Sequence, residues 1–380
     1  MTINEISKEK LVVAHITDVV DGRRNSGTAR VAVEHIQNLS KLSDIKQVLI
    51  HFEGKKDSIY FLPNIEEIVI PLKKFPFARH FFSFFMYWFP KYIFRQQDTF
   101  DIVHWHSSRV FPFFFLIPAR KIFITLHDAN NRILKNTNTF WTEIFYWNLR
   151  FFASKIHTIF GDSMDACGKL VSVGKFPKNK VKCLYLGSNF ETVKSKNILN
   201  FDPTQLYFLC VSRWQPFKNV ETLVEAYAKV LSIKPDAPNL VLVGKPVAGH
   251  DKPSQVLNRY LLQHKVLIFQ DLADEQLALL YRNAIINISP SLHEGFGLSV
   301  LEGIKCGCPS IDHKYTSTSE ISGPAGIHID MNSIDTIAEK LIEILKNPQI
   351  INELKANISQ RSRDFQWDNT TAKLLNYYQI

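Results

Sequence analysis

Two glutamates, Glu294 and Glu302, stand eight positions apart in the segment HEGFGLSVLEG. On one continuous helix they would lie ~12 Å apart along the axis, so they cannot hold a single atom together. Gly295 and Gly297 favour a loop around Glu294 and a helix that begins near Leu298, because glycine is costly inside a helix and lets backbone approach a ligand. The new helix start would offer N–H groups to an anion. The spacing therefore predicts a long ligand with hydroxyl groups at both ends and phosphate between them, the shape of a nucleotide-sugar.

Two cations, Arg213 and Lys218, occur in the segment VSRWQPFKN, which follows an expected strand and opens an expected helix. Open α/β sheets bind their ligands outside the carboxyl ends of the strands. Two positive charges at that place suit a diphosphate.

The elements that must position these residues alternate along the chain, with short apolar runs separated by longer amphipathic segments. This pattern is typical of parallel sheets with crossover helices, and 380 residues are enough for two such domains. Near residues 188–205 the periodicity is lost, which predicts a linker. The expected strands include residues 11–16, 47–52, 102–106, 121–126, 206–211, 240–243, 266–269 and 285–289, and the expected helices include residues 29–42, 221–231 and 275–282.

The two-glutamate segment is flanked by P-S and C-G-C-P, and together with VSRWQPFKN it resembles the family-4 retaining glycosyltransferases of the GT-B fold. The resemblance covers nearly the whole chain. It implies an α/β fold with two Rossmann-like doubly wound domains that face a central cleft. The expected acceptor-binding domain covers residues 1–195 and is completed by a C-terminal helix at 365–380 that crosses back onto it, and the nucleotide-sugar donor domain covers residues 203–364.

By this resemblance Arg213 and Lys218 would bind the diphosphate as the glycosidic bond breaks, Glu294 the donor sugar and Glu302 the ribose hydroxyls. His127, in the segment ITLHD, stands at the position that faces the donor sugar in relatives. The expected catalytic residues are Arg213, Lys218, Glu294 and His127, and the expected donor-binding residues are Gly27, Glu294, Gly295, Phe296, Gly297, Leu298 and Glu302.

Two of these assignments depart from the family pattern. The segment SGTARV resembles the glycine loop after the first strand, but the usual glycine pair is reduced to Ser26 and Gly27. Glu320 resembles a further donor-site carboxylate, although the polar residues Thr316, Ser317, Thr318 and Ser319 replace the glycines that usually precede it. For Glu320, a donor-site role and a purely structural role both stay open.

No metal and no cofactor is expected beside the nucleotide-sugar, which is a co-substrate. The sequence contains no D-x-D triplet, the paired aspartates with which other transferases hold a divalent ion. His104 and His106 would share one face of a strand, a geometry compatible with a metal site. Since the sequence shows no third ligand, packing at the end of the strand is the favoured interpretation.

Positive charge is concentrated in the first half of the chain. Residues 1–195 hold 27 Lys and Arg against 17 Asp and Glu, whereas residues 196–380 hold 18 against 19. The segment at residues 73–95 mixes aromatic and basic side chains and suits a membrane interface, because its apolar run is too short to span a bilayer. An aromatic core segment is the alternative, and core is the favoured interpretation for the second aromatic run at 111–118. The candidate interfacial residues are Lys73, Lys74, Arg79, Phe84, Phe85, Trp88, Lys91 and Arg95.

Several features predict a cytoplasmic protein that is peripheral on the inner face of the cytoplasmic membrane. The apolar run at residues 11–16 is too short for a signal peptide or a membrane span, and five scattered cysteines form no C-x-x-C pair. An anionic membrane surface would attract the basic half. Nucleic acid is not an expected partner, because no RNA- or DNA-binding motif occurs.

The expected function is transfer of a hexosyl or N-acetylhexosaminyl group, with retention at the anomeric carbon and without a metal. The expected donor is a nucleotide-diphosphate sugar, with UDP the commonest nucleotide among such enzymes. The expected acceptor is a hydroxyl of a lipid-linked saccharide, another glycan or a glycolipid in surface-polysaccharide or glycolipid biosynthesis. Transfer to a soluble acceptor and nucleotide-sugar epimerisation on the same fold are the alternatives. No residue separates the nucleotide bases or the sugars from one another.

Overall fold

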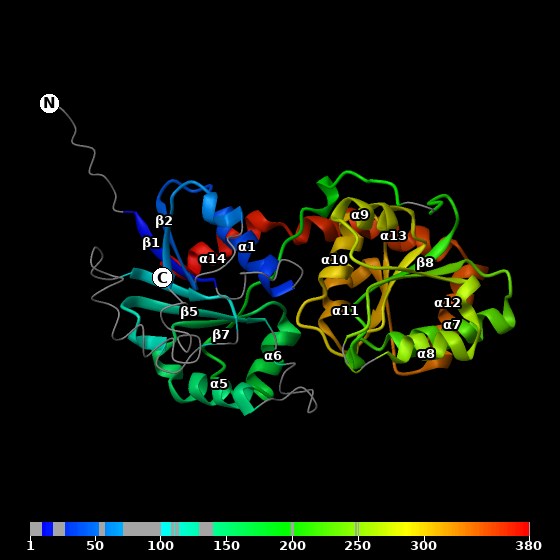
Figure 1. Ribbon diagram of the computed structural model, residues 1–380, viewed down its shortest axis with the longest axis horizontal. Coiled ribbons are helices and arrows are strands. Elements are labelled where there is room, and N and C mark those ends of the chain that lie inside the picture. The colour runs from blue at the N-terminus through cyan, green and yellow to red at the C-terminus, as the bar shows by residue number, and fades with distance from the viewer. Residues whose placement is uncertain are drawn as a thin grey trace. The chain divides into compact units, whose positions relative to one another are not determined.

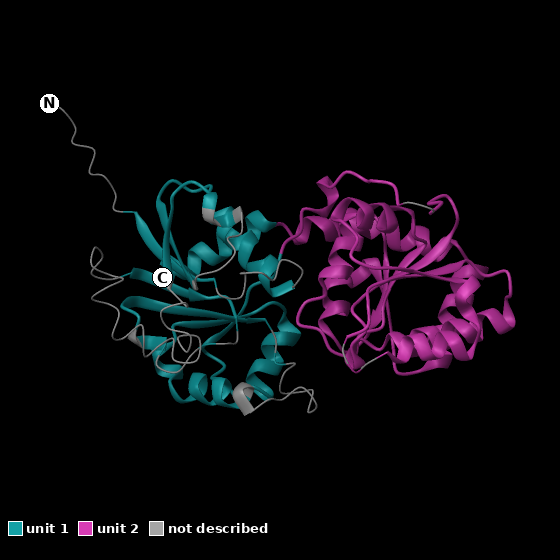
Figure 2. Ribbon diagram, viewed as in Figure 1, with its two compact units in different colours: residues 1–186, 367–380 teal, residues 187–366 magenta. Residues whose placement is uncertain are grey.

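The computed structural model describes residues 10–17, 27–52, 58–70, 100–107, 110, 114–127, 129, 140–198, 201–247, 249 and 251–379. The chain divides into two compact units, residues 1–186 with 367–380 and residues 187–366 (Figure 2). Each unit contains one parallel sheet covered by helices on both faces (Figure 1). This is the doubly wound α/β class that the alternating pattern predicts.

The first unit contains a seven-stranded parallel sheet in the order β3-β2-β1-β4-β5-β6-β7. The order reverses between β1 and β4, and open α/β sheets bind ligands at such a switch point. The strands are β1 Leu11–Ile16, β2 Ile45–Phe52, β3 Ile65–Ile70, β4 Phe100–Trp105, β5 Ala119–His127, β6 Thr158–Gly161 and β7 Val181–Cys183.

Alternation along the strands divides the core of this unit into two layers. Val13 and Ile102 pack with side chains of α1 and α14, whereas Ala14 and Val103 pack with side chains of α5 and α6. Phe114, from the second aromatic run, belongs to the latter layer, as predicted for a core residue. The helices are α1 Gly27–Leu39, α5 Phe140–Phe151, α6 Met164–Ser172 and α14 Trp367–Gln379.

The C-terminal helix α14 belongs to the first unit, which confirms the expected return of the chain. Tyr378 Oη and His104 Nδ1 share a hydrogen bond of 2.6 Å. Thr370 Oγ1 donates to the carbonyl oxygen of Tyr185 at 2.8 Å. These contacts join the end of the sequence to strands and loops of the first 186 residues.

The second unit contains a six-stranded parallel sheet in the order β10-β9-β8-β11-β12-β13, with its switch point between β8 and β11. Phe208 and Cys210 pack with α7 and α12, and Tyr207 and Leu209 pack with α9 on the other face. The strands are β8 Tyr207–Val211, β9 Asn239–Val243, β10 Val266–Phe269, β11 Ile286–Ser289, β12 Ser310–His313 and β13 Gly326–Ile329. The helices are α7 Val220–Ile233, α8 Lys252–Arg259, α9 Asp274–Asn283, α10 Leu298–Lys305, α11 Ser317–Ser322, α12 Ile334–Lys346 and α13 Gln349–Asp364.

The aperiodic segment after residue 187 is packed against the second unit. Phe190 and Ile198 lie in its core with Tyr281 of α9. The candidate interfacial segment at residues 73–95 and the glycine-loop residues that precede Gly27 lie outside the described residues. Within the described ranges, no helix is both long and apolar enough to cross a bilayer.

Candidate functional site

An ion pair lies at the switch point of the second sheet. β8 and β11 are neighbours, and the segment that follows each of them carries one member of the pair. Lys218 Nζ contacts Glu294 Oε1, and the two side chains are 19% and 15% exposed. Leu292 N–H donates to the carbonyl oxygen of Phe217 at 2.8 Å and thereby joins the two loops. The pair is thus held at the sheet edge where this fold class binds ligands.

The turn that carries Lys218 is held from two sides. It is a short 3-10 helix, Pro216–Lys218, followed by Asn219 in the left-handed region with φ 56°. Asn219 Nδ2 donates to the carbonyl oxygen of Met331 at 2.7 Å, and its Oδ1 accepts from Thr222 Oγ1 at 2.6 Å. These bonds direct Lys218 toward Glu294, whereas the side chain of Arg213, two residues after β8, is exposed.

Helix α10 begins at Leu298, as the glycine spacing predicts, and Glu294 lies in the loop before it. Gly297 adopts φ 102°, a region that side chains rarely occupy, and a Cβ atom there would lie 2.7 Å from Thr318 Cγ2. Ser317 Oγ donates to the carbonyl oxygen of Glu294 at 3.1 Å. The glutamate loop is therefore packed closely against the first turn of α11.

Gly297→Ala should destabilise this loop by about 1–3 kcal/mol, because alanine is strained at positive φ and its methyl group meets Thr318. The measurement is the urea unfolding free energy. Gly168→Ala in α6 is the matched control, since a Cβ atom there meets nothing within 4 Å. We expect Gly168→Ala to be neutral or slightly stabilising. Equal losses in both variants would contradict the explanation.

Glu302 lies inside α10 and is buried, so the two glutamates occupy different environments. Tyr281 Oη donates to Glu302 Oε2 at 3.4 Å. Burial, with the charge of Glu302 second, holds the pKa of Tyr281 well above its usual value. Three residues further, Lys305 Nζ pairs with Glu191 Oε1 at 3.1 Å, and burial lowers the pKa of this lysine. Sequence reasoning missed Tyr281 and Glu191, because neither belongs to a motif.

Glu320 lies in α11 and is half-buried. The guanidinium group of Arg361, from α13, donates to the backbone carbonyl oxygens of Glu320 and Ile321. Beneath this helix, the buried Asp312 accepts hydrogen bonds from Ser310 Oγ at 2.9 Å and Ser322 Oγ at 2.7 Å. The helix that follows the glutamate loop is thus held by α13 and by β12.

His127 ends β5 in the first unit and adopts φ 63°, at a shift in register between β5 and β6. Its Nδ1–H donates to Asp162 Oδ2 at 2.8 Å, and its Nε2 lies 3.3 Å from the carbonyl oxygen of His106. Asp162 directly follows β6, the neighbour of β5. Sequence reasoning did not select Asp162, because nothing in its local pattern separates it from a surface aspartate.

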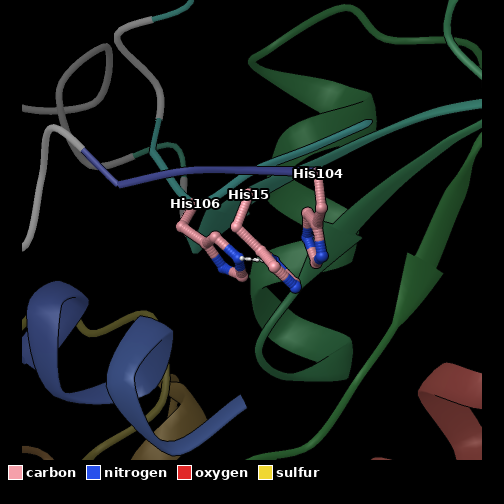
Figure 3. Close-up of side chains that lie close together, drawn as sticks. All are labelled: His15, His104 and His106. Atoms are coloured by element: carbon pink, nitrogen blue, oxygen red, sulfur yellow. Dashed lines mark hydrogen bonds between the residues drawn. The ribbon is translucent and has the colours of Figure 1, made fainter. Parts of the chain in front are cut away.

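Three buried histidines meet at the switch point of the first sheet (Figure 3). The parallel pairing of β1 with β4 brings His15 beside His104, so the structure supplies the third imidazole that the sequence did not show. Each ring offers one nitrogen, and these three nitrogens lie within 4.8 Å of one another. His15 Nδ1 and His106 Nε2 share a hydrogen bond of 2.9 Å.

Both nitrogens of His104 have partners, Tyr378 Oη at 2.6 Å and Thr125 Oγ1 at 2.8 Å. His35 of α1 packs against the same rings. Burial lowers the pKa of His15 and His35 to about 3, and it lowers the pKa of His104 and His106 well below the usual value. Neutral imidazoles are the form that binds metals, but an ion at this site would have to replace hydrogen bonds that the rings already make.

Residues 192–365 match the sequence model of the glycosyl transferases group 1 family. This segment is nearly the whole second unit and contains both glutamates and both cations. The matched segment is less than half of the chain, and over it the chain is similar to the group 1 glycosyl transferases. The resemblance of the two-glutamate segment to a glycosyltransferase family is thereby confirmed.

Relatives of this chain include the O-antigen chain mannosyltransferase B of Escherichia coli, 29% identical over 176 residues, which are 46% of each chain. An uncharacterized glycosyltransferase of Methanocaldococcus jannaschii is 25% identical over 361 residues, 91% of this chain and 93% of its own. The matches span less than half the length of each of the first five curated relatives.

Among solved structures, HepE of Anabaena in complex with UDP-glucose superposes with a TM-score of 0.72 at 14% identity, covering 96% of this chain and 98% of that one. At this identity the likeness shows the fold. Together with the two parallel sheets, it confirms the two-domain GT-B fold for this chain.

Proposed function

We propose that this chain is a glycosyl transferase that moves a sugar from a nucleotide-diphosphate sugar to a hydroxyl group of an acceptor, with retention at the anomeric carbon. The observation that carries the proposal is the Lys218–Glu294 pair, held at the switch point of the second sheet within the family segment. The relatives named as glycosyltransferases and the UDP-glucose complex of HepE support it. In this proposal the second unit binds the donor and the first unit, completed by α14, binds the acceptor.

The proposed chemistry depends on charge. Lys218 and Arg213 stabilise the negative charge that grows on the diphosphate as the glycosidic bond breaks. Glu294 accepts hydrogen bonds from the sugar, and Glu302 accepts them from the ribose hydroxyls. When the diphosphate enters, Lys218 can shift its contact from Glu294 to phosphate, which leaves the carboxylate for the sugar. The leaving phosphate itself helps to deprotonate the acceptor, and no metal ion takes part.

The donor is proposed to be a UDP-sugar that carries a hexosyl or N-acetylhexosaminyl group. HepE binds UDP-glucose, whereas the Escherichia coli relative is a mannosyltransferase. A thermal-shift comparison of UDP, GDP and ADP separates the bases, because a ligand at ~100 times its Kd stabilises the folded state by ~2.7 kcal/mol. The transfer test then uses sugars on the nucleotide that binds.

The transfer itself is tested with the selected donor and with a lipid-linked or soluble glycan acceptor, and the product is examined by NMR. An α-linked product from an α-linked donor is expected, and activity should persist in EDTA. A β-linked product would overturn retention, and a strict need for added divalent metal would overturn charge neutralisation by side chains. Turnover of the donor without any acceptor would indicate the epimerase instead.

The acceptor is proposed to be a lipid-linked saccharide or glycolipid in surface-polysaccharide or glycolipid biosynthesis, bound at the inner face of the cytoplasmic membrane. Support comes from the excess of positive charge in residues 1–195, the aromatic and basic segment at 73–95, and a relative named for the O-antigen chain. Each basic residue near an anionic surface contributes ~1 kcal/mol, and buried aromatic side chains add to it.

Sedimentation with anionic liposomes at low salt tests this location. The native chain should pellet, and binding should weaken with salt. The bound fraction should fall in two variants. One combines Lys73→Glu with Lys74→Glu, and the other changes Phe84, Phe85 and Trp88 to serine. Lys229→Glu with Lys234→Glu, in and directly after α7 of the second unit, is the charge-matched control. If the native chain stays in the supernatant, the soluble-acceptor alternative gains support.

A further inference from the structure

His127 and Asp162 are joined twice, once through their side chains and once through their backbones. Besides the bond of 2.8 Å between His127 Nδ1 and Asp162 Oδ2, Asp162 N–H donates to the carbonyl oxygen of His127 at 3.3 Å. His127 ends β5 and Asp162 directly follows β6, so neighbouring strands place the two residues side by side. Strand ends of this kind hold functional side chains more precisely than loops do.

Both ring nitrogens of His127 point at groups that can only accept hydrogen bonds. Nδ1 faces a carboxylate oxygen, and Nε2 faces the carbonyl oxygen of His106 at 3.3 Å. A neutral imidazole carries one N–H and satisfies one of these acceptors, whereas the imidazolium satisfies both. The contacts therefore favour a ring that carries a proton on each nitrogen.

The surroundings of Asp162 favour the same charge state. The carboxylate is nearly buried, and its other oxygen, Oδ1, has no hydrogen-bond partner among the described residues. A buried carboxylate is costly unless a positive group pairs with it. The start of α6, which Ser163 caps, contributes only a partial positive charge beside it.

The other titratable rings that face His127 are neutral. His35 from α1 and His104 and His106 from the region of β4 interact electrostatically with His127, and burial lowers the pKa of each of these three well below its ordinary value. Among these rings, His127 is the one whose ring nitrogen contacts a carboxylate, that of Asp162.

We propose that Asp162 is a positioning residue for the transfer reaction: it holds His127 as an imidazolium whose Nε2–H is directed at an oxygen atom of a substrate bound at the carboxyl end of the first sheet. The inference rests on the proposed function and extends it to a residue that no sequence motif selects. The long contact of 3.3 Å from Nε2 to the carbonyl oxygen of His106 is the bond that a substrate hydroxyl or phosphate oxygen would share or replace. Asp162 itself need not touch substrate.

Asp162→Asn keeps the shape of the side chain and removes its charge. We expect kcat to fall by about 10-fold or more, which is typical for carboxylates that orient a functional histidine, with the melting temperature unchanged. The matched control is Asp165→Asn, which removes the same charge from the first turn of α6, where Asp165 pairs with Lys169 at 2.6 Å. Normal activity is expected for this control.

A double-mutant cycle separates positioning from a general structural role. If Asp162 acts through His127, then Asp162→Asn should cost nothing further in a His127→Ala background. If the losses of kcat from the two single variants add fully in the double variant, the proposal is overturned. A kcat equal to that of the native protein in Asp162→Asn would also overturn it, but it would leave the proposed transferase activity unaffected.

A second measurement does not depend on activity. Nitrogen-15 NMR of the His127 ring should show two protonated nitrogens in the native protein near neutral pH and one in Asp162→Asn. A neutral ring in the native protein would overturn the proposal. Should no donor be turned over by the native chain, the proposed function fails, and the ring signals still decide whether Asp162 controls the charge of His127.

Discussion

Lys218→Ala is expected to slow sugar transfer ~100-fold or more, the loss that follows removal of a group that stabilises charge in the transition state. The ammonium group is held beside Glu294 at the switch point of the second sheet, where the diphosphate is proposed to bind. Arg213→Ala should act in the same direction. The measurement is kcat and the donor KM with saturating acceptor.

The fold should survive the loss of Lys218. The Lys218 and Glu294 side chains are 19% and 15% exposed, so water still reaches part of the carboxylate when the ammonium group is removed, and the melting temperature of the variant measures the remaining cost. Lys229→Ala is the matched control, because this lysine of α7 forms an exposed pair with Asp335 at 2.6 Å away from the glutamate loop. A change in donor KM alone for both cation variants would contradict the transition-state role.

Glu302→Ala should act mainly on donor affinity.

The first unit is expected to unfold cooperatively in mild acid. His15 and His35 have a folded-state pKa of about 3, and His104 and His106 are shifted in the same direction, all because of burial. The unfolded chain binds a proton at each histidine near pH 6.5, whereas the folded unit does not. The free energy of unfolding of the first unit is therefore highest above pH 6.5, and it decreases as the pH falls toward 3.

The size of this effect follows from proton linkage. Each buried histidine contributes a slope of up to ~1.4 kcal/mol per pH unit, so four give ~5 kcal/mol per unit once the unfolded chain is fully protonated. Since domains have free energies of unfolding of ~5–15 kcal/mol, we expect the acid transition at about pH 4–5. Urea unfolding at stepped pH, together with direct proton uptake, measures it.

His35→Leu provides the critical variant. Both ring nitrogens of His35 are buried and have no hydrogen-bond partner among the described residues, so leucine removes a titratable group without breaking such a bond. Proton uptake on unfolding should fall by about one, and the acid midpoint should move to lower pH. His264→Gln, at an exposed position of the second unit, should leave the transition of the first unit unchanged. Unchanged proton uptake in His35→Leu would contradict the linkage.

Local chemistry explains what could be predicted from the sequence. The glycines at 295 and 297 predicted that Glu294 lies in a loop and that the helix begins at Leu298, because the cost of glycine in a helix and its freedom at positive φ depend on the residue itself. Alternating apolar runs predicted the parallel sheets, because a buried strand is also recognised from its own residues. The strands that were not predicted are β3, β6, β7, β12 and β13. The last four have only three or four residues, which show little period, although the equally short β10 and β11 were predicted.

Partners far apart in the sequence were decided by the tertiary structure alone. Lys218 and Glu294 are 76 residues apart, and His104 and Tyr378 are 274 apart. The strand order places β8 beside β11, β1 beside β4 and β5 beside β6, and each adjacency creates one contact set: the Lys218–Glu294 pair, the buried histidines and the His127–Asp162 pair. Local sequence patterns record whether a segment is a strand and which of its faces is apolar. They do not record which strand becomes its neighbour, because that choice is made by the packing of helices and strands across the whole unit.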